Sequence, residues 1–181
     1  SAAMTDPAAY HAWYATPRGA WISGRELALL TELLHPHPGE SVLDVGCWTG
    51  HFSSALSDRG LDVTGLDPDL PALRFARQRD PRIALVAGRA GALPFAEGAF
   101  DHALAMTSLC FVPDPAQALR ELWRVSRRAV VLGLLHRRSL LYLSKHGCGG
   151  YRGARWDVLG EVLGWADGLT PTPEPSARFA L

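Results

Sequence analysis

Five short apolar segments, each bounded by turn-forming residues, alternate with helix-like stretches through the middle of this chain. The apolar segments have the length of buried strands and comprise residues 41–45, 63–66, 83–86, 103–106 and 129–135. The helix-like stretches comprise residues 52–58, 71–79 and 115–125. Alternation of this kind predicts an α/β fold in which helices cover both faces of a parallel sheet.

The ends of the chain are less regular. Residues 8–23 contain several aromatic side chains, which need a covering surface: Tyr10, Trp13, Tyr14 and Trp21. From residue 24 leucines recur at helical spacing, and the proline-containing segment 35–39 ends that pattern. After the fifth apolar segment we expect a helix at residues 137–146, a glycine-rich loop at 147–153 and a second helix at 157–163. An extended proline-rich tail at 170–175 follows.

Length and charge limit the classes of function. The 181 residues suffice for one domain with a buried core, and no repeat or linker divides them. Lys plus Arg and Asp plus Glu each number 18, so no net field favours nucleic acid or an anionic membrane, and a small-molecule partner fits best. Three widely spaced cysteines indicate a reducing compartment, and we expect a cytoplasmic protein without a membrane span.

A glycine-containing loop follows the first apolar segment. Gly46 lets the backbone approach a ligand closely, and Gly50 lets the loop turn into the following helix. Asp44 offers a carboxylate that can attract an ammonium group, such as that of an amino-acid moiety. A plain strand-to-helix turn would also explain Gly46 taken alone. The complete string favours a ligand site at the carboxyl edge of the sheet.

A second acidic residue, Asp67, ends the next apolar segment, 21 positions beyond Gly46. An acid at this place can bind two ribose hydroxyls, which makes a ligand containing adenosine plausible. A solvated carboxylate at a strand end is the alternative. The spacing from the glycine loop favours the ribose interpretation.

Three segments together resemble the class I S-adenosylmethionine-dependent methyltransferases, in particular their small-molecule, type 11-like branch. The segments are VLDVGCWTGHF at 42–52, VTGLD at 63–67, and AGRAGALPF at 87–95 followed by Phe100 and Asp101. The resemblance covers about residues 8–135. It implies a Rossmann-like, doubly wound, mostly parallel sheet with helices on both faces. It also implies S-adenosylmethionine as cofactor, S-adenosylhomocysteine as product, and in-line methyl transfer to a small-molecule acceptor.

The resemblance also implies which residues surround the cofactor. Asp44, Gly46 and Gly50 would hold its methionine part and Asp67 its ribose. The full set of expected cofactor-binding residues is Tyr14, Asp44, Gly46, Cys47, Trp48, Gly50, Asp67, Pro68, Leu70, Arg89, Ala90, Met106 and Thr107.

The adenine end departs from the family pattern at one position. Pro68 and Leu70 would flank the ring, and Ala90 would donate its backbone amide to the ring edge. Arg89 stands where the family usually has an acid that accepts a hydrogen bond from the adenine amino group, and a guanidinium cannot accept one. Arg89 could stack on the ring or point into solvent. Because one such bond contributes about 1 kcal/mol, we expect weaker binding rather than none.

The loop departs from the family as well, because Trp48 stands where a second glycine is usual. The loop can survive if its dihedrals suit a residue other than glycine. The indole could pack, stack on the ligand, or cover the aromatic N-terminal segment. We rank packing first and ligand contact second.

Methyl transfer from a sulfonium needs positioning more than acid–base chemistry. Met106 and Thr107 would border the sulfonium and the acceptor, although Met106 could equally be core. If a base is used, His136 after the fifth strand is a weak candidate, and a solvated loop histidine is the commoner role. Cys110 is most simply a small buried hydrophobe, and His146 with Cys148 is too small a set for a metal site.

By this resemblance residues 1–181 form a single methyltransferase domain, in which we expect three parts. Residues 8–36 form an aromatic and helical cap, 40–135 the cofactor-binding core, and 136–181 a variable region on the substrate side. In related enzymes an aromatic N-terminal segment closes over the cofactor, and we expect Tyr10, Trp13 and Tyr14 to form either such a lid or a helix packed on the domain. The remaining C-terminal residues are too few for the usual strand pair, so either that pair is incomplete or the edge is differently finished.

Two other functions compete. A nicotinamide-dependent dehydrogenase would need glycine at the positions of Trp48 and His51, which weighs against it. A catalytically inactive protein with the methyltransferase fold, acting as a binding or regulatory partner, is the alternative. Trp48, Arg89 and the short C-terminus favour that alternative. Neither the acceptor nor the oligomeric state can be read from these residues.

Overall fold

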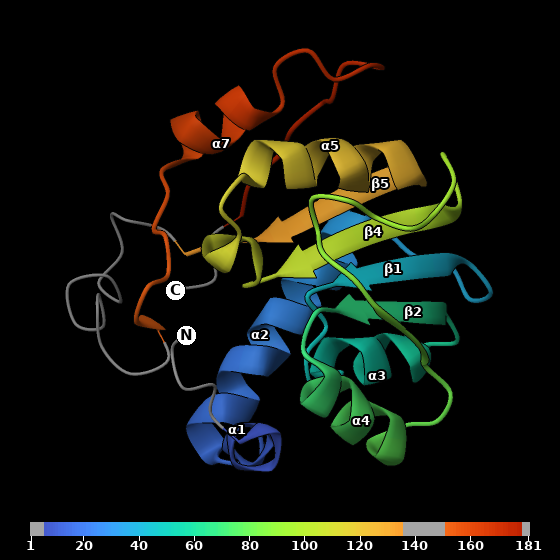
Figure 1. Cartoon of the computed structure of the whole chain (residues 1–181), viewed down its shortest axis with the longest axis vertical. Coiled ribbons are helices and arrows are strands. Elements are labelled where there is room, and N and C mark those ends of the chain that lie inside the picture. The colour runs from blue at the N-terminus through green and yellow to red at the C-terminus, as the bar shows by residue number, and fades with distance from the viewer. Residues whose placement is uncertain (1–5, 136–150, 179–181) are drawn as a thin grey trace.

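A single parallel sheet forms the centre of the computed structural model, which describes residues 6–135 and 151–178. Its five strands are β1 Ser41–Val45, β2 Asp62–Asp67, β3 Ala84–Ala87, β4 Phe100–Met106 and β5 Ser126–Gly133. They lie in the order β3-β2-β1-β4-β5, and every neighbouring pair is parallel. The predicted parallel sheet is therefore confirmed, and the carboxyl ends of all strands meet at one edge (Figure 1).

Helices precede, connect and follow these strands. They are α1 Pro7–Trp13, α2 Pro17–Leu34, α3 His51–Ser57, α4 Leu70–Arg79, the 3-10 helix η1 Leu109–Phe111, α5 Pro115–Val125 and α7 Leu159–Trp165. Four of them begin in the same way, with a proline in the first turn and a side-chain oxygen that accepts from the free amides of that turn. The capping residues are Asp6, Thr16, Asp69 and Asp114.

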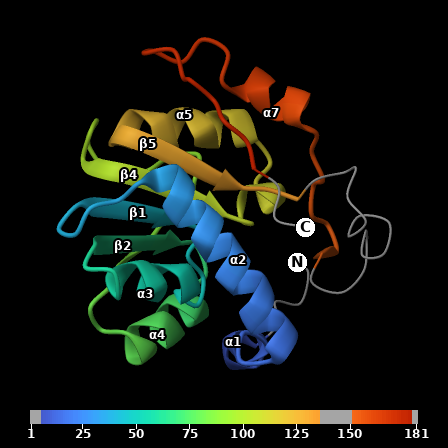
Figure 2. The same ribbon diagram turned by 180° about the vertical axis from the view of Figure 1, so that it is seen from behind.

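Two apolar clusters cover the two faces of the sheet. Leu30 and Leu34 of α2 pack with Phe52 and Leu56 of α3 against one face. On the other face, α5 contributes its buried side chains Ala118, Leu122 and Val125. The two ribbon views agree, because α5 lies before the sheet in Figure 1 and α2 crosses before it in Figure 2. The expected doubly wound fold is confirmed.

The main error in the expected elements concerns the N-terminal segment. The second helix begins at Pro17, seven residues before the expected start at residue 24, so the aromatic segment is largely helical. Pro17 and Gly19 suggest a helix break, yet Thr16 caps the helix and proline is favourable at its first position. Gly19 is needed there because a Cβ would lie 2.0 Å from the carbonyl oxygen of Trp13.

The C-terminal part differs less. The fifth strand starts at Ser126, three residues earlier than expected, and α7 starts two residues later than expected. Residues 170–175 contain neither helix nor strand, as expected. The helix expected at 137–146 and most of the loop at 147–153 lie outside the described residues. Within residues 151–178 no strand follows β5, and no described helix is long and apolar enough to cross a bilayer.

Candidate functional site

The loop between β1 and α3 adopts a conformation that only particular residues tolerate. Gly46 and Gly50 have φ values of 77° and 72°. At Gly46 an added Cβ would lie 2.3 Å from Cβ of Ser108, which follows β4. The Ser108 hydroxyl donates to the carbonyl of Val45 at 2.9 Å. The loop therefore lies tightly against the end of β4 through Ser108, in a packing role that no local sequence pattern marks.

Asp44 is buried at the carboxyl end of the central strand, with 2% of its surface exposed. Its Oδ2 accepts a hydrogen bond of 2.6 Å from the Ser53 hydroxyl of α3. Burial raises the pKa of Asp44 to about 6; the bond from Ser53 opposes this effect and the charge of Asp67 adds to it. A buried carboxylate with no cationic partner among its described contacts favours a cationic ligand group.

Asp67 ends β2, and its carboxylate links the loops that follow β1 and β2 at the same edge of the sheet. Its Oδ2 accepts from the backbone amide of Trp48 at 3.0 Å, and its Oδ1 accepts from that of Asp69 at 2.8 Å. Burial raises the pKa of Asp67, and the two backbone bonds oppose that effect. The residue is 7% exposed, so the solvated-carboxylate alternative is wrong. Each carboxylate oxygen can accept a further bond.

Trp48 covers the N-terminal segment. It has φ 43°, and its indole contacts the ring of Tyr10 edge to face, with centroids 4.3 Å apart. The observed contact is therefore with the aromatic N-terminal segment, the role ranked below packing and ligand contact. The indole Nε1 is buried without an acceptor among the described residues. A buried donor left unpaired costs about 1–3 kcal/mol, and a bound ligand is one way to supply its partner.

Tyr14 follows α1 and reaches the first turn of α3. Its ring stacks on the imidazole of His51, and its side chain hydrogen-bonds to that of Tyr10. Burial, together with the neighbouring charges of His11 and Arg79, lowers the pKa of His51 to about 4. His51 is therefore a neutral packing residue near pH 7.

The residues expected at the adenine end lie at the surface. Leu70 is 53% exposed at the start of α4, and Pro68 is also exposed. Arg89 is exposed and its backbone forms a bridge with Ala92, while Ala90 is half-buried. Of the two roles considered for Arg89, this placement fits the side chain that points into solvent.

Beyond β4 the chain is strained. Thr107 has φ 52°, an unusual value for a β-branched residue, and its amide donates to the carbonyl of Gly133 at 2.8 Å. Met106 packs with the core cluster under α2 and α3 and lies against Gly133. Met106 is therefore largely a core residue, which was the second role considered for it.

Other expected residues are not brought into one site. The thiol of Cys47 packs toward Gly65, where an added Cβ would lie 2.7 Å from it. Cys110 is buried and donates weakly to the carbonyl of Thr107, and burial raises the pKa of both thiols. Both cysteines therefore behave as small buried side chains. His136 lies outside the described residues and stays a prediction.

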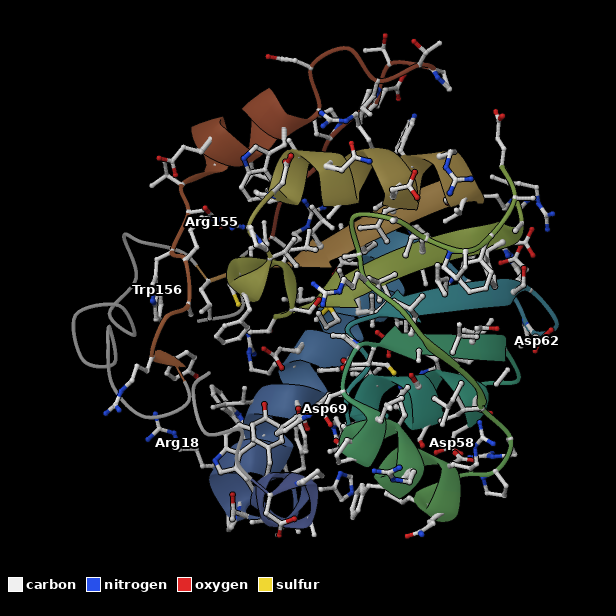
Figure 3. All side chains as sticks on the ribbon, in the orientation of Figure 1. Arg18, Asp58, Asp62, Asp69, Arg155 and Trp156 are labelled. Atoms are coloured by element: carbon white, nitrogen blue, oxygen red, sulfur yellow. The ribbon has the colours of Figure 1, made fainter. Side chains whose placement is uncertain are left out.

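Arg79 of α4 holds the end of the glycine loop by hydrogen bonds, and nothing in its local sequence marks this role. Its guanidinium donates to the carbonyl of Gly50 at 2.6 Å and to the hydroxyl of Ser54 at 2.7 Å. These bonds tie α4 to the start of α3 and to the end of the glycine loop. Figure 3 places Asp69 near this carboxyl edge and Asp62 at the opposite edge, at the start of β2.

Comparison with known proteins gives one family. Residues 43–132 match the family model described as a methyltransferase domain. An uncharacterized protein of Mycobacterium tuberculosis is 38% identical over 169 residues, 90% of this chain and 57% of that protein. A demethylmenaquinone methyltransferase of Renibacterium salmoninarum is 40% identical over 99 residues, 55% of this chain and 42% of the enzyme. The chain thus spans about half the length of these relatives.

A solved structure extends the likeness to the fold. A SAM-dependent methyltransferase of Thermotoga maritima, titled a possible histamine N-methyltransferase, superposes with a TM-score of 0.69 at 26% identity. The superposition covers 86% of this chain and 73% of that one. Residues 43–132, which match the family model, contain the glycine loop and both buried aspartates. This chain belongs to the class I S-adenosylmethionine-dependent methyltransferases, whose cofactor is S-adenosylmethionine and whose product is S-adenosylhomocysteine.

Proposed function

We propose that this chain binds S-adenosylmethionine at the carboxyl edge of its sheet and methylates a small-molecule acceptor. The observation that carries this proposal is the pair of buried carboxylates, Asp44 and Asp67, at the ends of adjacent central strands. The cofactor has an ammonium group at one end and two ribose hydroxyls further along. These groups match a buried acid without a cation and a second acid with acceptor capacity left.

The residues around the loop fit this cofactor. Asp44 would hold the amino-acid end, Asp67 the ribose, and Pro68 with Leu70 would flank the adenine ring. The unpaired indole N–H of Trp48 would find its acceptor among the polar atoms of the cofactor. Tyr14 would cover the site from the N-terminal side. Arg89, exposed in place of an acid, would contribute no bond to the adenine amino group.

The bound cofactor supplies an electrophilic methyl carbon. The task of the chain is then to place the acceptor in line with the breaking bond and to exclude water. Thr107, held in its strained conformation after β4, is well placed to border the acceptor. The aromatic rings of Tyr10 and Tyr14 would exclude water from the N-terminal side of the site.

Two observations support a small-molecule acceptor. The chain has no net charge, which disfavours a nucleic-acid substrate. The relative from Renibacterium is a demethylmenaquinone methyltransferase, and the Thermotoga structure is titled a possible histamine N-methyltransferase. Both names refer to small molecules.

Calorimetric titration with S-adenosylmethionine and S-adenosylhomocysteine tests the proposal. We expect Asp67→Asn to weaken binding of both by about tenfold or more, because a charge-assisted acceptor is lost. Asp62→Asn, at the exposed opposite end of the same strand, is the matched control and should leave binding unchanged. Failure of the unmodified chain to bind either ligand would overturn the proposal and favour the inactive, partner-binding alternative.

A further inference from the structure

An acidic residue occupies the buried stripe of α2. The buried residues of this helix, Gly19, Ser23, Leu30 and Leu34, recur at helical spacing. Glu26 stands in the same stripe, three positions after Ser23 and four before Leu30, and it is half-buried. Such positions usually carry apolar side chains, so a carboxylate here is unusual and indicates a function other than core packing.

The position of Glu26 along α2 brings it to the edge of the sheet at which the proposed site lies. Leu30 and Leu34 pack on the sheet, and the chain enters β1 at Ser41, shortly after α2 ends. Glu26 is eight residues before Leu34, about 12 Å along the helix. A five-residue strand spans about 16 Å, so Glu26 comes near the level of the carboxyl ends of the strands. Figure 2 shows the N-terminal half of α2 running past these ends.

The charge of Glu26 acts on three tyrosine side chains from two parts of the chain. Burial raises the pKa of Tyr10, Tyr14 and Tyr151, and the negative charge of Glu26 adds to this effect in all three. The charge of Asp44 also acts on Tyr14. Tyr14 therefore lies within the electrostatic reach of both Asp44, on the amino-acid side of the proposed cofactor, and Glu26.

The carboxylate of Glu26 lacks a partner in the part of the chain that the structure describes. Burial raises its pKa to about 7, and neither a hydrogen bond nor a described cation opposes this effect. Glu32 on the same helix differs, because it is exposed and accepts a bond of 3.2 Å from Arg178. Burying a carboxylate without a partner is unfavourable in free energy, and a hydrogen-bond donor or a cation of a ligand can offset that term.

We propose that Glu26 receives the methyl acceptor, an inference that rests on the proposed function. Its carboxylate accepts a hydrogen bond from a nitrogen or oxygen nucleophile that carries a proton, such as a small amine or hydroxyl compound. The lone pair of the nucleophile forms the bond to the methyl carbon, and the carbon–sulfur bond breaks with its electron pair left on sulfur. The proton passes from the nucleophile to Glu26.

Paired titrations with S-adenosylhomocysteine and sinefungin test this inference without knowledge of the acceptor. Sinefungin carries an amino group where the cofactor carries its methyl group, so it presents an N–H donor toward the acceptor side. We expect the unmodified chain and Glu32→Gln to favour sinefungin over S-adenosylhomocysteine. In Glu26→Gln this preference should fall by about tenfold, because a charge-assisted bond is lost, while affinity for S-adenosylhomocysteine stays the same.

Each outcome has a distinct meaning. Equal preference in Glu26→Gln and Glu32→Gln overturns the assignment of Glu26 and leaves the proposed function standing. Failure of the unmodified chain to bind S-adenosylhomocysteine overturns the proposed function itself. Circular dichroism of both variants establishes that they are folded before the titrations are compared.

A pH series on the unmodified chain gives a second measurement if Glu26→Gln does not fold. The preference for sinefungin should decrease as the pH falls from 8 to 6, because Glu26 becomes protonated. Asp44 meets the same amino-acid end in both ligands, so its titration cancels in the ratio. The tyrosines on which Glu26 acts, Tyr10, Tyr14 and Tyr151, have raised pKa values and stay neutral over this range, as does Cys110, which acts on Tyr10 and Tyr151. A preference that does not change with pH overturns the inference.

Discussion

The ring of Tyr14 lies flat on the imidazole of His51, with centroids 3.5 Å apart and ring planes 3° apart. The contact joins the segment between α1 and α2 to the first turn of α3, directly after Gly50. Trp48 and Tyr10 add a second contact, between α1 and the glycine loop. The N-terminal segment is therefore attached to the glycine loop by aromatic packing.

Removing this stack should loosen the N-terminal segment. We expect Tyr14→Ala to raise the rate of tryptic cleavage after Arg18, which is exposed in the first turn of α2, by several fold. Tyr14→Phe keeps the ring and should cleave at the original rate. Cleavage after Arg59, exposed beyond α3, is the internal control. If S-adenosylhomocysteine does not slow cleavage after Arg18 in the unmodified chain, the segment does not act as a lid.

The unpaired indole N–H of Trp48 predicts opposite effects on stability and binding. Trp48→Phe keeps an aromatic ring against Tyr10 and removes the buried donor. We expect the free energy of unfolding of the ligand-free chain to rise by about 1 kcal/mol and the affinity for S-adenosylhomocysteine to fall severalfold. Chemical denaturation and calorimetry measure the two effects. Trp21→Phe, at a side chain that is 56% exposed, should change neither, and unaltered affinity in Trp48→Phe would show that the indole does not contact the ligand.

Asp44 should make the ligand-free chain less stable at high pH. Its pKa is raised in the folded state to about 6, so folding favours the protonated form, and this contribution is lost as the pH rises through about 6. Asp44→Asn removes the free-energy cost of burying the ionised carboxylate. We expect the variant to be more stable than the unmodified chain by up to about 3 kcal/mol at pH 8 and equally stable near pH 4.

Urea denaturation across this pH range measures the Asp44 effect, and Asp62→Asn at the exposed start of β2 is the control. The same Asp44→Asn change should weaken binding of S-adenosylhomocysteine, because the ammonium group loses its charged partner. A stability difference that does not vary with pH would show that Asp44 titrates at its ordinary value.

Close packing at Gly65 predicts a loss of stability. A Cβ there would lie 2.7 Å from the thiol of Cys47 and 3.0 Å from a methyl carbon of Leu85, so Gly65→Ala should cost about 1–3 kcal/mol. Gly24→Ala in α2 meets open space and should instead stabilise by about 0.5–1 kcal/mol, since alanine favours a helix. Thermal denaturation measures the expected loss of stability in Gly65→Ala and the expected gain in Gly24→Ala. Equal effects of the two changes would contradict the packing described around Cys47.

Local patterns predicted most of the fold. Runs of buried apolar residues placed the strands, and the carboxyl-edge loop with Asp44 and Asp67 was visible because a ligand loop after a strand needs small residues at fixed spacing. The N-terminal helix was misplaced because Pro17 and Gly19 suggest a break. Their favourable roles become apparent only from the cap at Thr16 and the close approach of Trp13.

The sequence by itself determined the order of strands and helices, the glycine loop and its two acids, because these depend on neighbours along the chain. Tertiary structure alone decided that Ser53 and Ser108 hold the loop, that Trp48 covers Tyr10, and that the charge of Glu26 acts on the tyrosines. Each of these relationships joins residues from different elements. Their chemistry depends on burial and distance, which exist only once the sheet and its helices have packed.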